Sequence, residues 1–475
     1  MSIYKAYDIR GIYPDELNEE LAKKIAQAFA VMRKKELNKE QITLVVGADM
    51  RLSSPSLKKQ VIEGLFQSGV RVIDIDLVST PTFYFAVSYF GYDGGLMVSA
   101  SHNPAQYNGI KLVREGAKPF GQGNGMEELQ KIVENMSLRD EGEAILRSSE
   151  SSGIATSLSG LAMTIENKGN VILKEEMLFT QTKEEEKFAD LKKIRPMKIV
   201  ADAANAMGAQ YLSELFADLP QIELIKMNFD LDGTFPSHEA DPFKDENIAD
   251  LKKRVLQEKA DLGIATDGDG DRIFFIDNKG ELVEPSIIRG IMAELFLRDN
   301  PGSTICYDIR PGKITRDMIE QNGGVPSVTR VGHSLIKKQM LETGAIFGGE
   351  SSGHFFVKFP YGVFEAPMVV TLKLLQELSE KNISLADYTE PLKKYFHSGE
   401  INFKVADKNA VTQKLKEKFA DAEISDLDGL TFEYPDFWFN VRASNTESLL
   451  RLNLEGINKK IVENKLGEIK KIIEE

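Results

Sequence analysis

Three stretches of the chain repeat one alternation of apolar and polar residues. Each opens with a short apolar run, continues through a polar loop into an amphipathic stretch of helical spacing, and ends in a second apolar run. In the first repeat, Ser54 and Pro55 are a natural N-cap and first-turn pair for the helix. The opening runs are ITLVVGAD (42–49), KIVADAANAMG (198–208) and STICYDI (303–309).

An aspartate closes the first apolar run of every repeat. These residues are Asp49, Asp202 and Asp308, and the second apolar run starts about 20 residues later in each case. That separation is the length that a strand–helix–strand crossover between parallel strands needs. The pattern therefore predicts three similar mixed α/β domains that bind ligands at the carboxyl ends of their strands.

The pattern changes after about residue 396. Residues 430–456 alternate apolar and polar positions like a strand hairpin, and residues 457–475 are typical of a charged closing helix. A polar stretch between Glu134 and Lys193 indicates a linker near the first boundary. We therefore expect an α/β protein of four domains, the last of them α+β, with the boundaries 1–150, 151–258, 259–385 and 396–475.

Length and composition narrow the class of protein. At roughly 100 to 200 residues per domain, the 475 residues suit three or four domains. The net charge of −14 repels polyanions, which argues against a nucleic-acid or membrane partner. The single cysteine, Cys306, suits a reducing compartment, and residues 1–11 lack the apolar core of a signal peptide. No stretch approaches the ~20 apolar residues of a membrane helix, so we expect a cytoplasmic protein.

The segment ATDGDGDR carries the most informative chemistry. Asp267, Asp269 and Asp271 alternate with glycines between two strand-like runs. Three carboxylates this close repel one another, and a divalent cation such as Mg²⁺ removes that repulsion. A solvated acidic turn is the simpler alternative. A calcium EF-hand loop is excluded because its sixth and twelfth positions would be Arg272 and Asn278 rather than Gly and Glu.

The segment SASHNP follows another apolar run. It places Ser101 at the carboxyl end of a strand, beside His102 and upstream of Lys111. A serine there is placed for phosphoryl transfer, although serine is a poor nucleophile without activation. Taken alone, such a segment is more often an ordinary turn.

Two further segments combine glycines or hydroxyls with charge. In GGESSGH, Glu350, Ser352 and His354 alternate and could bind the vicinal hydroxyls of a sugar; a plain glycine-rich turn is the alternative. In RASNTE, Arg442 stands with hydroxyl and amide side chains between two strands, as in a phosphate clamp. A hairpin turn would explain the polar residues there, but not Arg442.

In this order the segments resemble the α-D-phosphohexomutase superfamily, in its phosphomannomutase/phosphoglucomutase branch. The opening KAYDIRG (5–11) and the stretches from Asp232 and from Arg330 are similar to that family as well, so the resemblance covers essentially the whole chain. It implies four domains around one central cleft, each contributing one loop. It also implies interconversion of hexose 1-phosphate and hexose 6-phosphate through a phosphoserine and a hexose 1,6-bisphosphate that reorients in the cleft.

The resemblance assigns roles residue by residue. Mg²⁺ is the implied cofactor, hexose 1,6-bisphosphate the activator and a phosphosugar the substrate, with no nucleic-acid or membrane partner and a monomer or weak dimer. The implied metal ligands are a phosphate on Ser101 with Asp267, Asp269 and Asp271. The implied catalytic residues are Ser101, His102, Lys111, Arg10, Arg272 and His354. The implied substrate-binding residues are Tyr7, Arg310, His333, Glu350, Ser352, Arg442, Ser444, Asn445 and Thr446.

Three departures from the family pattern stand out. Arg310 replaces a frequent lysine, Phe364-Glu365-Ala366 replaces an Asp-Asp-Gly, and residues 138–170 match poorly. The RASNTE form favours the mannose/glucose branch over phosphoglucosamine mutases, which remain an alternative. The sequence also leaves open a sugar-phosphate phosphatase and an inactive sugar-phosphate-binding homologue, and it does not rank mannose against glucose.

Overall fold

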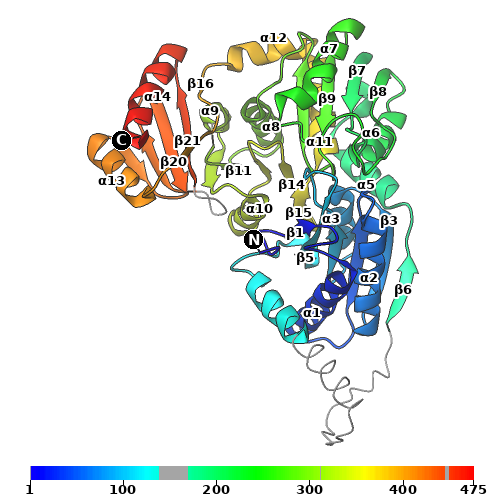
Figure 1. The fold of residues 1–475 in the computed structure, drawn as a ribbon. Helices are drawn as coiled ribbons and strands as arrows, with labels where there is room; N and C mark the ends of the chain where they lie inside the picture. The colour runs from blue at the N-terminus through cyan, green and yellow to red at the C-terminus, as the bar shows by residue number, and fades with distance from the viewer. Residues whose placement is uncertain (1, 138–168, 311, 444–448, 475) are drawn as a thin grey trace, which may run out of the picture.

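The structure is a computed structural model that describes residues 2–137, 169–310, 312–443 and 449–474. Its strands form four sheets, and each sheet is the centre of one domain (Figure 1). Three domains are mixed α/β and the fourth is antiparallel α+β, which confirms the expected fold class.

The first sheet has six strands in the order β1-β5-β4-β2-β3-β6. β2 runs parallel to β3 and β4, whereas β5 is antiparallel to β4 and β1. α1 and α2 pack on one face, and α3 packs on the other. The elements are β1 (Ile9–Ile12), α1 (Glu19–Leu37), β2 (Thr43–Ala48), α2 (Ser54–Gln67), β3 (Arg71–Leu77), α3 (Thr80–Tyr89), β4 (Gly94–Val98), β5 (Tyr107–Arg114) and β6 (Asn170–Leu173).

The second sheet has the order β10-β9-β7-β8, with β9 and β10 joined as an antiparallel hairpin. Its elements are α5 (Met177–Glu185), β7 (Met197–Asp202), α6 (Gly208–Ala217), β8 (Ile222–Met227), α7 (Ala249–Glu258), β9 (Leu262–Thr266) and β10 (Ile273–Asp277).

The third sheet has the order β12-β11-β13-β14-β15. Its elements are α8 (Pro285–Asp299), β11 (Thr304–Asp308), α9 (Lys313–Gln321), β12 (Val325–Thr329), α10 (His333–Thr343), β13 (Phe347–Gly349), β14 (Phe355–Phe359), β15 (Gly362–Glu365), α11 (Pro367–Lys381) and α12 (Leu385–Thr389).

The fourth sheet is antiparallel and follows the order β16-β21-β20-β19-β18, with β17 also paired to β21. Its elements are β16 (Phe396–His397), β17 (Ile401–Lys404), α13 (Lys408–Lys418), β18 (Glu423–Ser425), β19 (Leu430–Glu433), β20 (Phe437–Ala443), β21 (Leu449–Gly456) and α14 (Lys459–Glu474).

The predicted repeat is present in all three α/β domains. The crossovers are β2-α2-β3, β7-α6-β8 and β11-α9-β12, and each pair of strands is parallel. Asp49, Asp202 and Asp308 lie buried at the carboxyl ends of the first strands. In each of the three α/β domains, the site loop described below leaves the sheet at this carboxyl-terminal edge.

Two sheets extend across boundaries that the sequence analysis expected. β6 follows residue 151 but pairs with β3 of the first sheet, and β9 and β10 follow residue 259 but belong to the second sheet with β7. Strands that share backbone hydrogen bonds share a core. We therefore propose that the first domain extends to Leu173 and the second to Asp277.

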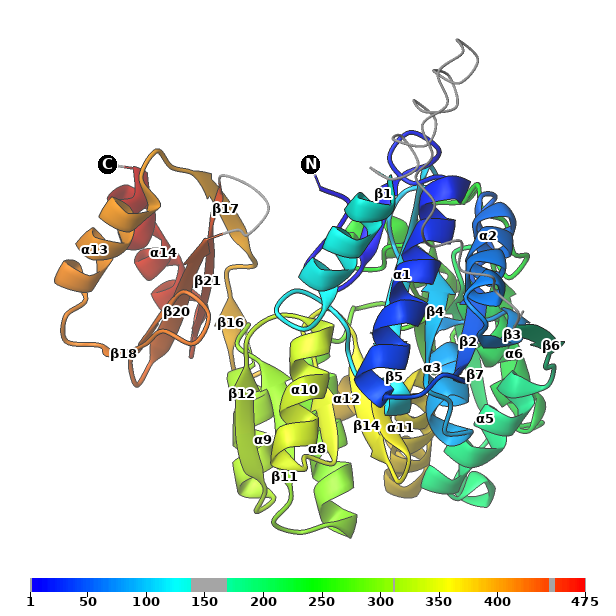
Figure 2. The same ribbon diagram turned by 90° about the horizontal axis from the view of Figure 1, so that it is seen from below.

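The hydrophobic core consists of several clusters, one of which joins the first three domains. One cluster of buried residues runs from α3 through the second and third domains, whereas the fourth domain has a cluster of its own. In both ribbon views the fourth domain stands to one side and follows the third through β16 (Figures 1 and 2). Among the helices of the described residues, none combines the length and the apolar character needed to span a membrane.

Candidate active site

The serine loop follows β4 and is held by its main chain. Ser101 is buried and has a positive φ of 51°. Its N–H donates to Ser99 Oγ (3.0 Å), and its carbonyl oxygen accepts from Arg51 Nη2 (2.7 Å). Arg51 is fully buried and also donates to the carbonyl oxygens of Asn103 (2.5 Å) and Pro104 (2.8 Å). The loop is therefore fixed around one guanidinium group, which the sequence analysis did not identify.

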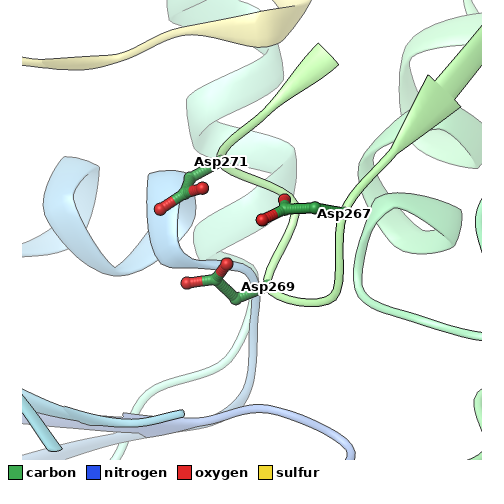
Figure 3. Close-up of side chains that lie close together, drawn as sticks. All are labelled: Asp267, Asp269 and Asp271. Carbon is green, nitrogen blue, oxygen red and sulfur yellow. The ribbon is translucent and has the colours of Figure 1, made fainter. Parts of the chain in front are cut away.

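The metal loop is the turn between β9 and β10. One carboxylate oxygen from each of Asp267, Asp269 and Asp271 lies within 4.8 Å of the others, and all three residues are buried. Figure 3 shows the three side chains pointing toward one another. Ser101 Oγ donates to Asp267 Oδ2 over 3.0 Å. A Cβ on Gly268 would lie 2.3 Å from the Ser101 carbonyl oxygen, so only glycine lets the two loops approach this closely.

Two residues of the first domain bind Asp269. Lys111 Nζ donates to Asp269 Oδ2 (2.6 Å) and to Asp271 Oδ2 (2.7 Å). Thr80 Oγ1 also donates to Asp269 Oδ2 (2.5 Å), and the Thr80 N–H donates to the Asp269 carbonyl oxygen (2.9 Å). Asp269 Oδ1 is buried and has no hydrogen-bond partner among the described residues. A buried carboxylate oxygen without a donor, in a set of three carboxylates, fits a hard divalent cation.

The charges of the triad are unequal. Burial and then the carboxylates of Asp271 and Asp269 raise the pKa of Asp267 well above its ordinary value. Burial acts in the same direction on Asp271, but Lys111 and His354 prevail and hold its pKa well below the ordinary value. For Lys111, burial opposes the charged form, yet Asp269 and Asp271 raise its pKa well above normal. A divalent cation would relieve the repulsion among the three carboxylates, which adds to burial in raising the pKa of Asp267.

The sugar loop connects β13 to β14 and touches the metal loop. His354 Nδ1 lies 3.1 Å from Glu350 Oε2 and 2.9 Å from Ser352 Oγ, and Nε2 lies 3.1 Å from Asp271 Oδ1. Burial disfavours the imidazolium, but Asp271 and Glu350 outweigh it and raise the pKa of His354 to about 9. His354 therefore joins the two loops as a charged bridge.

Three arginine or histidine residues surround these loops. Arg10 Nη1 donates to the Ala100 carbonyl oxygen (3.2 Å) and to Asn103 Oδ1 (2.5 Å). His102 Nδ1 lies 3.3 Å from Ser101 Oγ, and Arg272, then burial, hold the His102 pKa well below its ordinary value. Arg272 Nε lies 3.7 Å from Asp267 Oδ2 and 3.4 Å from His354 Nε2.

The remaining residues of the third domain extend the site. Arg310 Nη2 donates to Ser352 Oγ (3.5 Å) and lies 3.8 Å from Glu350 Oε1. Tyr7 from the first domain donates to the Val331 carbonyl oxygen (3.0 Å), and its ring lies 5.3 Å from that of His333.

Phe364-Glu365, which departs from the family pattern, lies next to the candidate site. Glu365 is buried and pairs with Lys337 at 3.2 Å, close behind His333, whose Nδ1 lies 3.8 Å from Glu365 Oε1. The carboxylate therefore lies beneath the site rather than on its surface.

The fourth domain contributes a pair of arginines. Arg442 on β20 lies directly opposite Arg451 on β21, and both contact Glu400. Ser444, Asn445 and Thr446, which the sequence analysis assigned to phosphate binding, lie outside the described residues. Glu400 faces the third domain across a cavity of about 250 Å³ that Arg310 and Ser351 also line.

A buried serine against a carboxylate triad, with lysine and arginine beside it and the loop of Glu350 and His354 attached, defines the class of protein as a phosphotransfer enzyme. Four domain families, described as phosphoglucomutase/phosphomannomutase domains I, II, III and the C-terminal domain, match residues 1–140, 179–280, 284–395 and 400–471. The chain therefore belongs to the phosphoglucomutase/phosphomannomutase family and is a hexose-phosphate mutase, an isomerase of carbohydrate metabolism.

Relatives of known name match the chain from end to end. A phosphomannomutase of Vibrio cholerae is 36% identical over 482 residues, covering 100% of this chain and 98% of its own. A phosphomannomutase of Methanocaldococcus jannaschii is 36% identical over 479 residues, with the same coverage of 100% and 98%. A crystal structure of a phosphoglucomutase/phosphomannomutase family protein from Burkholderia thailandensis superposes with a TM-score of 0.83 at 29% identity, covering 99% of this chain and 96% of that one.

Proposed function

We propose that this mutase moves a phosphoryl group between O1 and O6 of a hexose, mannose and/or glucose, through a phosphoserine at Ser101. One observation carries the proposal: Ser101 Oγ donates to Asp267 over 3.0 Å, within a buried carboxylate triad that also binds Lys111. Serine is a weak nucleophile, and charged groups in a site with little water would increase its reactivity. The names of the Vibrio and Methanocaldococcus relatives support a hexose of the mannose type.

We propose Mg²⁺ as the metal. Asp267, Asp269 and Asp271 would hold it together with a phosphate oxygen on Ser101, and the unpartnered Asp269 Oδ1 supports this assignment. When bound, Mg²⁺ would neutralise charge on the transferring phosphoryl group and lower the barrier to its transfer.

In the first half-reaction the bond between phosphorus and Ser101 Oγ breaks, and a new bond forms to a sugar hydroxyl oxygen. That hydroxyl loses its proton, and Ser101 Oγ gains one. Lys111 and Arg272 lie beside the triad and would stabilise the negative charge of the phosphoryl group during its transfer. We propose His354 as the proton-transfer residue, because its two nitrogens contact Glu350 and Asp271 and can keep a proton in place.

The second half-reaction needs the other end of the sugar. The hexose 1,6-bisphosphate must turn so that its second phosphate reaches Ser101 and regenerates the phosphoserine. Glu350 and Ser352 can bind the O3 and O4 hydroxyls in either orientation, and Arg442 can bind either distal phosphate. Loss of the bisphosphate before it turns leaves dephosphorylated enzyme, so hexose 1,6-bisphosphate is the expected activator.

The test is a steady-state assay of the purified, dephosphorylated protein. Mannose 1-phosphate, glucose 1-phosphate and glucosamine 1-phosphate are compared, each with and without a trace of the matching bisphosphate and with Mg²⁺ or EDTA. We expect conversion of the first two to the 6-phosphates, dependent on both additions. Release of inorganic phosphate without isomerisation would instead indicate a phosphatase, and preference for the glucosamine ester would indicate a phosphoglucosamine mutase.

A further inference from the structure

The two arginines of the fourth domain share a carboxylate partner, Glu400, whose contacts suggest a role in the phosphate clamp. We propose that Glu400 is a positioning residue of the clamp: it holds Arg442 in the orientation that receives the distal phosphate of the substrate. This inference rests on the proposed function of Arg442 as a phosphate ligand.

Glu400 ties together two strands and the connection between domains. It lies between β16 and β17, where the chain passes from the third to the fourth domain. Its Oε2 accepts from Arg442 Nη2 on β20 (2.6 Å) and from Asn453 Nδ2 on β21 (3.5 Å), and its Oε1 lies 3.4 Å from Arg451 Nη1. One carboxylate thus fixes side chains of the two neighbouring strands β20 and β21.

Glu400 leaves part of Arg442 available. A guanidinium group has five N–H donors, and the hydrogen bond to Glu400 uses only one of them, on Nη2. Arg442 Nε is buried and has no hydrogen-bond partner among the residues that the structure describes. A buried donor without an acceptor is unfavourable until a ligand supplies one, so an anion can bind Arg442 while Glu400 stays in place.

The position of Glu400 relative to the third domain agrees with this role. Glu400 and Asn453 line the cavity of about 250 Å³ with Arg310 and Ser351, so the carboxylate partner of Arg442 lies where the fourth domain meets the third. Although burial opposes ionisation, the hydrogen bond and charge of Arg442 hold the pKa of Glu400 below its ordinary value. The carboxylate is therefore charged and able to orient the guanidinium at neutral pH.

Glu400 could instead have the opposite effect on phosphate binding. A carboxylate beside a phosphate repels it, so Glu400 could instead occupy the clamp and weaken phosphate binding. Removing a competitor would tighten binding, whereas removing a positioning residue would weaken it. The direction of the change in phosphate affinity therefore distinguishes the two roles.

The experiment measures KM and kcat for a hexose 1-phosphate, and the inhibition constant of inorganic phosphate, in Glu400→Ala, Glu400→Gln and Arg442→Ala. Glu433→Gln is the matched control, because Glu433 faces Arg316 at 3.6 Å across the same two domains but not the clamp. We expect Glu400→Ala to raise both KM and the phosphate inhibition constant roughly tenfold with kcat nearly unchanged, and Glu400→Gln, which keeps an acceptor, to recover part of the loss.

The double variant Glu400→Ala/Arg442→Ala completes the cycle. If Glu400 acts through Arg442, the double variant binds no worse than Arg442→Ala alone. Unchanged or tighter binding in Glu400→Ala, with Arg442→Ala strongly impaired, would overturn the positioning role and leave the clamp intact. Unchanged binding in Arg442→Ala would instead refute the clamp itself, and the role of Glu400 with it.

Discussion

The two oxygens of Asp269 have different surroundings. Oδ2 accepts hydrogen bonds from Lys111 and Thr80, both from the first domain, whereas Oδ1 is buried without a partner among the described residues. Thr80 is the first residue of α3, and the Asp269 carbonyl oxygen accepts its N–H. The amino end of a helix favours negative charge. Thr80 therefore fixes the carboxylate by one oxygen and leaves the other available to the proposed cation.

Thr80→Val tests whether Thr80 fixes the orientation of the Asp269 carboxylate. Valine keeps the shape but removes the hydroxyl donor, so Asp269 can rotate and metal affinity is expected to fall roughly tenfold or more. Thr80→Ser, which keeps the donor, is the matched control and is expected to bind nearly as the parent does. Isothermal titration of Mg²⁺ into the folded proteins measures the affinity directly. Equal affinity in the valine and serine variants would contradict the role of Thr80.

The pattern of residues alone could predict the site residues of the metal loop, whose partners are close along the chain. The alternation in DGDGDR and its strand-like flanks predicted a triad, and the structure brings its carboxylates together. Arg51, Thr80 and Glu400 could not be identified in this way. Their partners Ser101, Asp269 and Arg442 lie 50, 189 and 42 residues away in sequence, so only the folded chain brings them together.

At the scale of elements, an Asp-x-Arg pattern recurs beside the site. Asp8 and Arg10 at β1 are paired at 2.8 Å, Asp49 and Arg51 after β2 at 3.2 Å, and Asp308 and Arg310 after β11 at 2.6 Å. Residues two apart on an extended chain point to the same side. Each carboxylate can therefore orient its guanidinium: the first two reach the serine loop and the third reaches the sugar loop.

Arg51→Lys tests the serine-loop arginine. Lysine keeps the charge but cannot donate to the carbonyl oxygens of Ser101, Asn103 and Pro104 together, and each lost hydrogen bond costs about 1 kcal/mol. We expect a thermal midpoint lower by a few degrees and slower phosphorylation of Ser101 by a bisphosphate. The exposed Arg71→Lys is the control in the same sheet. An Arg51→Lys enzyme with parental stability and rate would contradict this account of the loop.

At the scale of the whole molecule, the first three domains share a core and the fourth does not. The proposed turning of a bisphosphate within the site would need room, which a movement of the fourth domain could supply without opening the shared core. The domain arrangement was predictable from the local strand–helix–strand pattern. The pairing of β6 and β9 was not, because these strands pair with strands far from them in sequence.

The junction of the first three domains contains a buried acid. Glu185 of α5 accepts from Gln181 Nε2 (2.7 Å), and Gln181 in turn accepts from Thr82 of α3 (2.7 Å). Burial outweighs these contacts and raises the pKa of Glu185 from 4.5 to about 8. The folded protein therefore keeps this carboxyl neutral at pH values where the unfolded chain ionises it.

The consequence is a loss of stability with rising pH. The contribution of Glu185 is fully present below about pH 4.5, falls between about pH 4.5 and 8 by at most about 5 kcal/mol, and is constant above about pH 8. Glu185→Gln, which stays neutral, is expected to melt at higher temperature than the parent at pH 8.5 and similarly at pH 4.5. Glu184→Gln, on the same helix, controls for loss of a carboxylate. The same difference at both pH values would show that Glu185 does not titrate in this range.

The central claim is that Ser101 carries the phosphoryl group. Purified enzyme is incubated with a hexose 1,6-bisphosphate, digested, and analysed by mass spectrometry, alongside Ser101→Ala and Ser99→Ala. Ser99 is the matched control because it is equally buried and its Oγ accepts from the Ser101 N–H. We expect one phosphate on Ser101 in the parent and in Ser99→Ala, and neither phosphate nor turnover in Ser101→Ala. Phosphate on Ser99, or full turnover in Ser101→Ala, would contradict the account.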